Sequence, residues 1–195
     1  MKAVFLDKDG TLIEDVPYNI DPDKIRLCAG ALEAVQMLAA ADYQIFIITN
    51  QSGIARGYFP ESALINVEKH LRQLLATAGV SLASFYYCPH HPQGVITEFA
   101  IDCDCRKPNA GLLKKAAKEH SIKLDRSWMI GDILNDIEAG NTVGCRTILI
   151  DNGNETEWQL SRSRLPNFIV NNLREAAAVI MASDRSPPQK KHAYS

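Results

Sequence analysis

MKAVFLDKDGTLI, residues 1–13, is the stretch that decides the fold of this chain. The apolar run from Ala3 to Leu6 is short, rich in β-forming residues and ended by Asp7, which is typical of a buried strand. Ligands of open parallel sheets bind in the crevice outside the carboxyl ends of the strands, so this strand would deliver Asp7 and Asp9 to that crevice. The two carboxylates could hold a divalent cation, act on a substrate or do both, and an ordinary Asp-Gly turn is the alternative.

The composition limits the class of protein. The chain has 195 residues, enough for one domain with a substantial core. Its 21 Lys and Arg residues nearly balance 23 Asp and Glu residues, so the formal net charge of −2 provides no attraction to nucleic acid or to an anionic membrane. No apolar run of the sequence approaches the ~20 residues of a membrane span. We therefore expect a cytoplasmic monomer with no nucleic-acid or membrane partner.

Strand and helix patterns alternate along the chain. Apolar runs predict further strands over residues 43–48, 85–87, 127–130, 146–150 and 168–170. Helical spacing of apolar residues predicts helices over residues 30–41, 60–78, 110–120, 137–142 and 173–181. This alternation predicts an α/β fold, a doubly wound Rossmann-like parallel sheet with helices on both faces. We expect a single domain over residues 1–182 and, because residues 183–195 are poor in apolar side chains, a disordered tail.

Polar side chains also follow other predicted strands. Residues 49–52 (TNQS) come after the second strand, Asp132 and Asp136 come after the fourth, and Lys107 lies in a loop before a helix. The carboxyl ends of parallel strands meet at one edge of the sheet, so these groups should converge with the acids of the first strand. Phosphoryl transfer needs a nucleophile, a hard cation, a protein cation and hydrogen-bond donors, and this set offers each of them.

Four motifs at these positions resemble those of the haloacid dehalogenase-like phosphohydrolases: DKDGT (7–11), TNQ (49–51), RKP (106–108) and GDILND (131–136). Outside the loop 88–105 no long insertion separates them, so the resemblance implies a capless phosphoric monoester hydrolase. TNQSGIARG, CPHHPQG and CDCRKP are similar to the heptose 1,7-bisphosphate phosphatase branch, which implies a small phosphorylated sugar as substrate and removal of its 7-phosphate. A histidinol-phosphate phosphatase and a non-catalytic zinc-stabilised binding module are the alternatives.

The resemblance also implies roles for the motif residues. Asp7 would be the nucleophile that forms an aspartyl-phosphate, and Asp9 would protonate the leaving oxygen and then activate water. Thr49 and Lys107 would bind phosphoryl oxygens. The implied ligands of Mg²⁺ are the carboxylates of Asp7 and Asp132 and the backbone carbonyl of Asp9, with Asp136 as an accessory ligand.

Further residues are candidates for substrate binding. The non-periodic segment 14–26 should lie over the crevice. The candidate contacts are Asp15, Tyr18, Asn50, Gln51, Ser52 and Arg106. Arg106 precedes Lys107, and its guanidinium fork suits a second phosphate, although a surface Arg without a ligand is the alternative. The heptose branch often has Lys where this chain has Ile133.

Three of the five cysteines cluster in the loop 88–105. The paired spacings Cys88-x-His90 and Cys103-x-Cys105 supply four ligands that suit tetrahedral Zn²⁺. His91 is an alternative ligand, and separate buried thiols beside a surface His are the alternative for the whole group. Because four protein ligands leave no open position, the zinc should be structural. The remaining cysteines, Cys28 and Cys145, should pack as small apolar residues.

Overall fold

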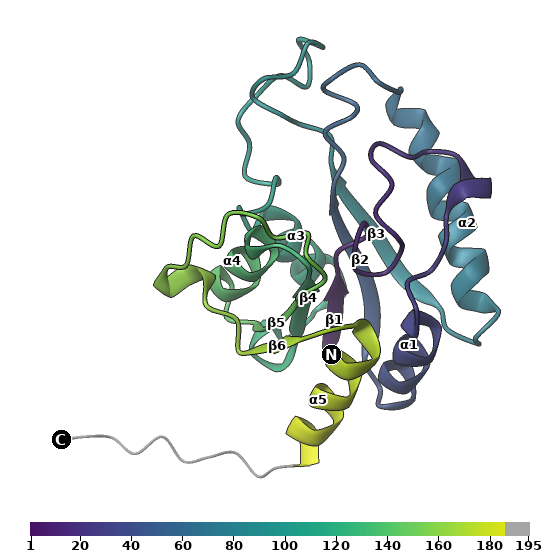
Figure 1. Cartoon of the computed structure of the whole chain (residues 1–195), viewed down its shortest axis with the longest axis vertical. Coiled ribbons are helices and arrows are strands. Elements are labelled where there is room, and N and C mark those ends of the chain that lie inside the picture. The colour runs from purple at the N-terminus through teal and green to yellow at the C-terminus, as the bar shows by residue number, and fades with distance from the viewer. Residues whose placement is uncertain (186–195) are drawn as a thin grey trace.

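A parallel six-stranded sheet in the order β3-β2-β1-β4-β5-β6 forms the centre of the computed structural model, which describes residues 1–185 (Figure 1). The strands are β1 (Ala3–Leu6), β2 (Gln44–Asn50), β3 (Leu82–Cys88), β4 (Trp128–Gly131), β5 (Arg146–Ile150) and β6 (Phe168–Val170). The helices are α1 (Ala31–Ala40), α2 (Leu64–Ala76), α3 (Gly111–His120), α4 (Leu134–Thr142) and α5 (Leu173–Arg185). Short 3-10 turns lie at Pro22–Lys24, Glu61–Ala63, Leu124–Arg126 and Arg162–Arg164. In the part of the chain that is described, no helix is both long and apolar enough to cross a membrane.

The strand order reverses at β1, which lies between β2 and β4. Phe5 of β1 is in register with Phe46 on one side and with Met129 on the other. The side chains of a strand alternate between the two faces of the sheet. Val4 and Leu6 accordingly pack in a core cluster with α1, α2 and α5, whereas Phe5 packs on the opposite face with α3. The predicted doubly wound α/β fold is confirmed, and its reversal point places a ligand crevice beside β1.

Two boundaries near this crevice differ from the sequence prediction. β2 continues to Asn50, so the polar residues of the second motif begin inside the strand and leave from its end. α4 begins at Leu134, three residues before the predicted start. The Asp136 carboxylate accepts a hydrogen bond from the Ile133 backbone N–H at 3.4 Å, which caps the first turn. The acids of this motif therefore open a helix instead of forming a separate turn.

The last helix is also longer than predicted. α5 extends to Arg185, so the first three residues of the predicted disordered tail are helical, and residues 186–195 lie outside the described chain. Asp184, near the end of α5, pairs with Lys2 at 2.8 Å and accepts a hydrogen bond from the Tyr43 hydroxyl at 2.9 Å. These contacts tie the last helix to the start of the chain.

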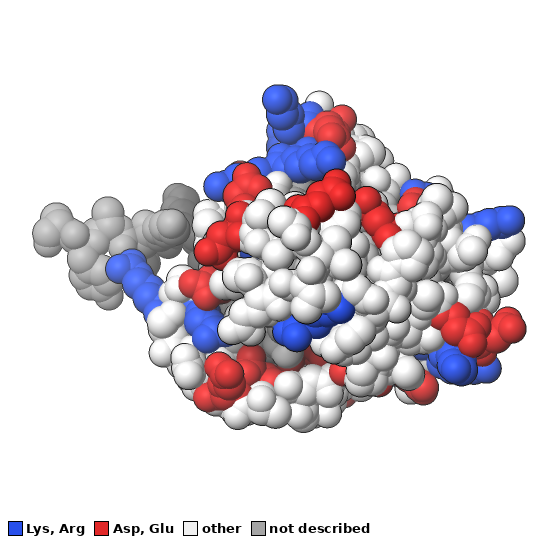
Figure 2. All heavy atoms as spheres, turned by 90° about the horizontal axis from the view of Figure 1, so that it is seen from above, with Lys and Arg blue, Asp and Glu red and all other residues white. Residues whose placement is uncertain are grey.

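The loop after β3 is the largest excursion from the sheet and rises beyond the strand ends (Figure 1). Within residues 1–185 no cap domain is inserted between the four motifs, as predicted. Figure 2 views the molecule from the end toward which the strands run and shows basic and acidic side chains scattered across this face. Because the described residues form no cap domain, loops shape the access to the crevice.

Candidate active site

Three buried carboxylates converge at the ends of β1 and β4. One oxygen each from Asp7, Asp132 and Asp136 lies within 4.8 Å of the others. Gly10 permits this approach, because its φ is +75° and an added Cβ would lie only 2.0 Å from Oδ2 of Asp132. A cluster of carboxylate oxygens suits a hard cation such as Mg²⁺.

Lys107 lies against this acidic cluster and is only 3 % exposed. Its Nζ donates to the carboxylate of Asp7, lies 2.6 Å from Oδ1 of Asp136 and donates to the carbonyl of Ile48 at 2.9 Å. Burial disfavours the ammonium ion, but the adjacent Asp136 and Asp7 carboxylates outweigh this and raise the pKa of Lys107. The lysine is therefore charged and fixed beside Asp7.

One lysine does not neutralise three buried acids. Burial raises the pKa of Asp7 to about 7, although the Lys107 charge opposes the shift. Burial and the Asp7 charge raise the pKa of Asp132 to about 6, and burial also raises the pKa of Asp136. The cluster is thus short of positive charge, which a divalent cation would supply, and so the residues fit Mg²⁺.

Asp9 lies at the mouth of the site, and its side chain is 30 % exposed. Its Oδ1 lies 2.5 Å from Nζ of the buried Lys8, and its Oδ2 accepts a weak hydrogen bond from Gln51 Nε2 at 3.4 Å. The same Gln51 amide donates to the hydroxyl of Thr49 at 2.9 Å. An oriented carboxylate with access to water is suited to proton transfer.

Two cavities adjoin at the site and share Asp9, Asp15 and Asn50. The first, about 220 Å³, is lined by Asp7, Asp9, Asp15, Thr49, Asn50, Lys107, Asp132, Ile133 and Asn154. The second, about 250 Å³, is lined by Lys8, Asp9, Asp15, Pro17, Tyr18, Asn19, Asn50, Gln51, Ser52 and Gly53. Of the segment 14–26, Asp15, Pro17, Tyr18 and Asn19 line the crevice, and the Tyr18 ring meets the Tyr58 ring edge to face at 4.5 Å. The first cavity has the groups for phosphoryl transfer, and the second has mostly neutral polar groups.

Arg106 does not line either cavity, in contrast to the other predicted substrate contacts. Its Nη1 donates to the His90 carbonyl at 3.3 Å. Nearby, Nη2 of Arg56 lies 3.0 Å from Nε2 of His91. Burial, together with the Arg106 and Arg56 charges, lowers the pKa of His91. Within residues 1–185 neither arginine has an acidic partner, so Arg56, His91 and Arg106 form a basic cluster without a counter-charge.

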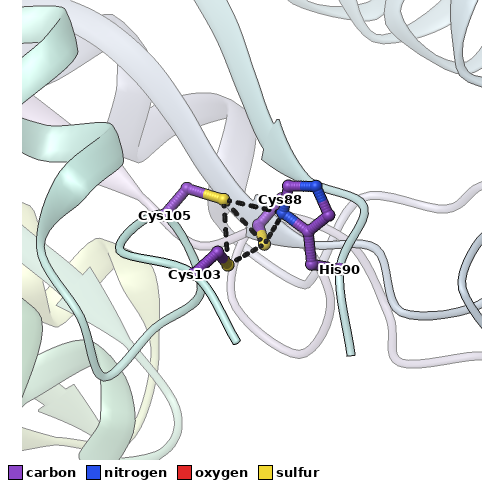
Figure 3. A group of neighbouring side chains, drawn as sticks. All are labelled: Cys88, His90, Cys103 and Cys105. Carbon is purple, nitrogen blue, oxygen red and sulfur yellow. Dashed lines mark hydrogen bonds between the residues drawn. The ribbon is translucent and has the colours of Figure 1, made fainter. Parts of the chain in front are cut away.

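The four predicted zinc ligands converge in the loop after β3 (Figure 3). Sγ of Cys105 lies 3.0 Å from Sγ of Cys88, 3.2 Å from Sγ of Cys103 and 3.3 Å from Nδ1 of His90. All the cysteines are free thiols. His91 is outside the group, because its ring contacts Arg56 instead. One nitrogen and three sulfurs at these separations fit a tetrahedral Zn²⁺ site.

The two cysteines outside this group take the predicted packing positions. Cys145 is buried in the core cluster beneath α3, and Cys28 packs at the margin of the cluster on the other face. Burial raises the pKa of Cys145 to about 12 and that of Cys28 to about 11. Both side chains are therefore protonated, and neither belongs to the zinc-ligand group.

Similarity to known proteins identifies the family. The HAD-hydrolase-like family model matches residues 104–176. The D-glycero-beta-D-manno-heptose-1,7-bisphosphate 7-phosphatase of Pasteurella multocida is 44% identical over 153 residues, covering 78% of this chain and 83% of that protein. The chain belongs to this family of HAD-like phosphatases. It is therefore a phosphoric monoester hydrolase.

Other members of the family agree with this assignment. The Escherichia coli K12 7-phosphatase is 37% identical over 177 residues, covering 86% of this phosphatase and 93% of that protein. The D,D-heptose 1.7-bisphosphate phosphatase from B. bronchiseptica, solved with magnesium and phosphate, has a TM-score of 0.81 and 30% identity. The match covers 94% of this phosphatase and 99% of that chain. The fold of the whole described chain is thus that of the family.

The sequence prediction missed two asparagines of this phosphatase. Nδ2 of Asn152 donates to the Gly10 carbonyl at 2.7 Å, and Nδ2 of Asn154 donates to Oδ2 of Asp132 at 2.7 Å. Both belong to the polar run Asp151-Asn152-Gly153-Asn154 directly after β5. A polar run at a strand end was the signal used for the other strands, and it could have identified these residues too.

Asn50 lines both cavities, and its side chain also binds the backbone of another residue of the site. Its Oδ1 accepts from the backbone N–H of Lys107 at 3.0 Å, and its Nδ2 donates to the Lys107 carbonyl at 3.0 Å. Both polar groups of the side chain are thus engaged by the backbone of Lys107. This geometry suits a residue that positions Lys107, and binding of substrate by Asn50 stays a prediction.

Replacement of Asn50 by Leu should therefore lower kcat and leave KM nearly unchanged. A small displacement of a catalytic group can cost about 100-fold, and we expect a decrease of about 10- to 100-fold. Ser52→Ala is the matched control, because Ser52 lines the second cavity without contacting Lys107. Steady-state kinetics at saturating Mg²⁺ measure both parameters. An increase in KM at constant kcat in Asn50→Leu would instead assign Asn50 to substrate binding.

Proposed function

We propose that this phosphatase removes the 7-phosphate of D-glycero-D-manno-heptose 1,7-bisphosphate through an aspartyl-phosphate on Asp7, with Mg²⁺ as cofactor. The observation that carries the proposal is the buried group of Asp7, Asp132, Asp136 and Lys107 at the base of a cavity. Relatives at 37–44% identity bear the name of this activity. A small phosphorylated sugar is accordingly the proposed substrate.

The chemistry follows from the positions of Asp7 and Asp9. The Asp7 carboxylate attacks phosphorus, the bond from phosphorus to the sugar oxygen breaks, and the Asp9 carboxyl gives its proton to that oxygen. Asp9 then takes a proton from water, which attacks the aspartyl-phosphate and regenerates Asp7 with release of phosphate. Lys107 opposes the rise that burial causes in the pKa of Asp7, and it holds the carboxylate in position. Bound Mg²⁺ would supply charge neutralisation for the phosphoryl oxygens.

We propose that one structural Zn²⁺ binds at the end of β3 and in the loop that follows it. Cys88, His90, Cys103 and Cys105 would hold it through Sγ atoms and through Nδ1 of the imidazole. Burial raises the pKa of Cys88 to about 11, so the thiols would not ionise near neutral pH unless a metal were bound. All four positions of a tetrahedron would be filled by the protein, and so this zinc would not act on the substrate.

Turnover across three substrates tests the proposal. Phosphate release should be faster with heptose 1,7-bisphosphate than with histidinol phosphate or with a heptose monophosphate, and EDTA should abolish it. The basic cluster suits a second phosphate and disfavours the cationic amine of histidinol phosphate. Preference for histidinol phosphate would replace the proposed substrate with the alternative, and turnover that survives EDTA would refute the Mg²⁺ requirement.

The basic cluster is the proposed position of the phosphate that is not removed. Arg106 directly precedes Lys107, and Arg56 follows the cavity-lining Ser52 by one turn, with its N–H donating to the Ser52 carbonyl at 3.0 Å. The two guanidinium groups have no acidic partner within residues 1–185. A phosphate dianion would satisfy both of them through charge-assisted hydrogen bonds.

Arg106→Ala should therefore lower kcat/KM for the heptose bisphosphate and hardly affect a monophosphate of similar size. Loss of one charge-assisted contact costs about 1.5–3 kcal/mol, on the order of 10- to 100-fold. Arg126→Ala, in the 3-10 turn before β4 and far from the basic cluster in sequence, is the control. Equal losses on the two substrates would place Arg106 in the shared phosphoryl site.

A further inference from the structure

The segment after β5 reaches back across the acidic cluster. Within it, Asn152 donates to the Gly10 carbonyl at 2.7 Å, and Oε2 of Glu155 accepts from the backbone N–H of Leu134 at 2.6 Å. These bonds join the segment to the loop after β1 and to the first turn of α4. Asn154 lies between the two anchors, and its own backbone N–H donates to Oδ1 of Asn152 at 3.1 Å.

The Asn154 carboxamide contacts one oxygen of Asp132. Its Nδ2 donates to Oδ2 at 2.7 Å, although Asn154 itself is solvent-exposed and Asp132 is only 5% exposed. Gly10 lies beside the same contact, because a Cβ there would approach Oδ2 of Asp132 to 2.0 Å and Nδ2 of Asn154 to 2.5 Å. The missing Cβ of Gly10 therefore leaves room for the hydrogen bond that holds Oδ2. The orientation of the whole carboxylate is fixed with it.

We infer that Asn154 is a positioning residue for the cation site. By holding Oδ2, it fixes the orientation of the Asp132 carboxylate, one oxygen of which lies within 4.8 Å of oxygens of Asp7 and Asp136. An amide suits this task because it satisfies a lone pair without adding a positive charge that would compete with the cation. Groups that orient metal ligands typically contribute 10- to 100-fold in metal affinity. The inference rests on the Mg²⁺ site of the proposed function.

Calorimetric titration with MgCl₂ of protein that has been dialysed against Mg²⁺-free buffer without a chelator, and that retains its zinc, tests the inference directly. In Asn154→Ala we expect the Kd for Mg²⁺ to rise about 10- to 100-fold. Activity should need correspondingly more Mg²⁺ and recover to within a few-fold of the wild-type kcat at saturation. Gln159→Ala is the matched control, because it removes an exposed carboxamide that has no side-chain hydrogen bond to the described residues of the chain. Its Kd should equal that of the wild type.

The outcomes separate this inference from the proposed function. An unchanged Kd in Asn154→Ala, with normal binding by the wild type, overturns the positioning role alone. The positioning role is also overturned if Asn154→Ala binds Mg²⁺ with a normal Kd but keeps a low kcat at every Mg²⁺ concentration. That result would place Asn154 in contact with substrate. A wild-type protein that binds no Mg²⁺ overturns the cation site itself. The melting temperature of metal-free Asn154→Ala should match the wild type, because the residue is exposed.

Discussion

Asp7→Asn is expected to lower turnover by about 10⁴- to 10⁶-fold, the range seen when a catalytic nucleophile is removed. The amide cannot attack phosphorus, so no phosphorylated protein should form. With an aryl phosphate the leaving group needs little protonation, so Asp9→Asn should still be phosphorylated and should accumulate the aspartyl-phosphate, because activation of water is impaired. Rapid quench with a labelled aryl phosphate would measure a burst of about one equivalent in Asp9→Asn and none in Asp7→Asn.

The fold of Asp7→Asn should remain intact, which separates loss of chemistry from loss of structure. Burial raises the pKa of Asp7 to about 7, so the folded state disfavours the ionised carboxylate relative to the unfolded chain. In the absence of a cation, the penalty for ionised Asp7 therefore grows as the pH rises from 3.8 to about 7 and is complete above pH 7, and the neutral amide removes it. The melting temperature of metal-free Asp7→Asn at pH 8 should equal or exceed that of the wild type. Retention of most of the activity would refute the covalent mechanism.

The positions of the catalytic groups were predictable because a parallel sheet collects its strand ends. An apolar run ended by Asp7 locates one end, and the polar runs after residues 48 and 130 locate two more. Once the strands are parallel, these ends must meet, whatever the details of the loops. The zinc-ligand group was predictable for a similar reason, since the paired spacings of ligand residues restrict the geometry they can adopt.

The direction of each side chain was less predictable than its position. Asn50 stands at a strand end, as expected, but its amide faces the backbone of Lys107, which is 57 residues away in the chain. Arg106 is adjacent to Lys107 in sequence, yet its guanidinium donates to His90 and does not line the cavities. A pattern of residue types shows which edge of the sheet a group occupies. It does not show which of several nearby partners the group will bind.

Loss of zinc should have the second large effect, because the zinc-ligand group lies next to Lys107 in the chain. Cys105 is a proposed ligand, Arg106 follows it, and Lys107 donates to Asp7. Without metal, only weak hydrogen bonds between sulfur atoms 3.0–3.5 Å apart would hold the three thiols together. We expect the loop to detach from the end of β3 and to carry Lys107 out of position.

Cys105→Ser should lose the bound zinc, lower the melting temperature and reduce turnover. Zinc binding contributes ~10–16 kcal/mol in small peptides, and even a quarter of this would lower the melting temperature of a chain of this size by roughly 5–15 °C. Metal analysis of the purified proteins should give one zinc per wild-type chain and none in the variant. Cys28→Ser is the control, because Cys28 lies outside the zinc-ligand group and should keep both zinc and activity.

Limited proteolysis would show where the change occurs. New cleavage sites in Cys105→Ser should fall within residues 89–104, because the sheet retains its own core on both faces and only the loop depends on the metal. Addition of Zn²⁺ to wild-type protein stripped by a chelator should restore both protease resistance and turnover, whereas Mg²⁺ alone should restore neither. A wild-type protein that contains no zinc and yet resists proteolysis in this loop would show that the four side chains are held by packing and that the site is not a zinc site.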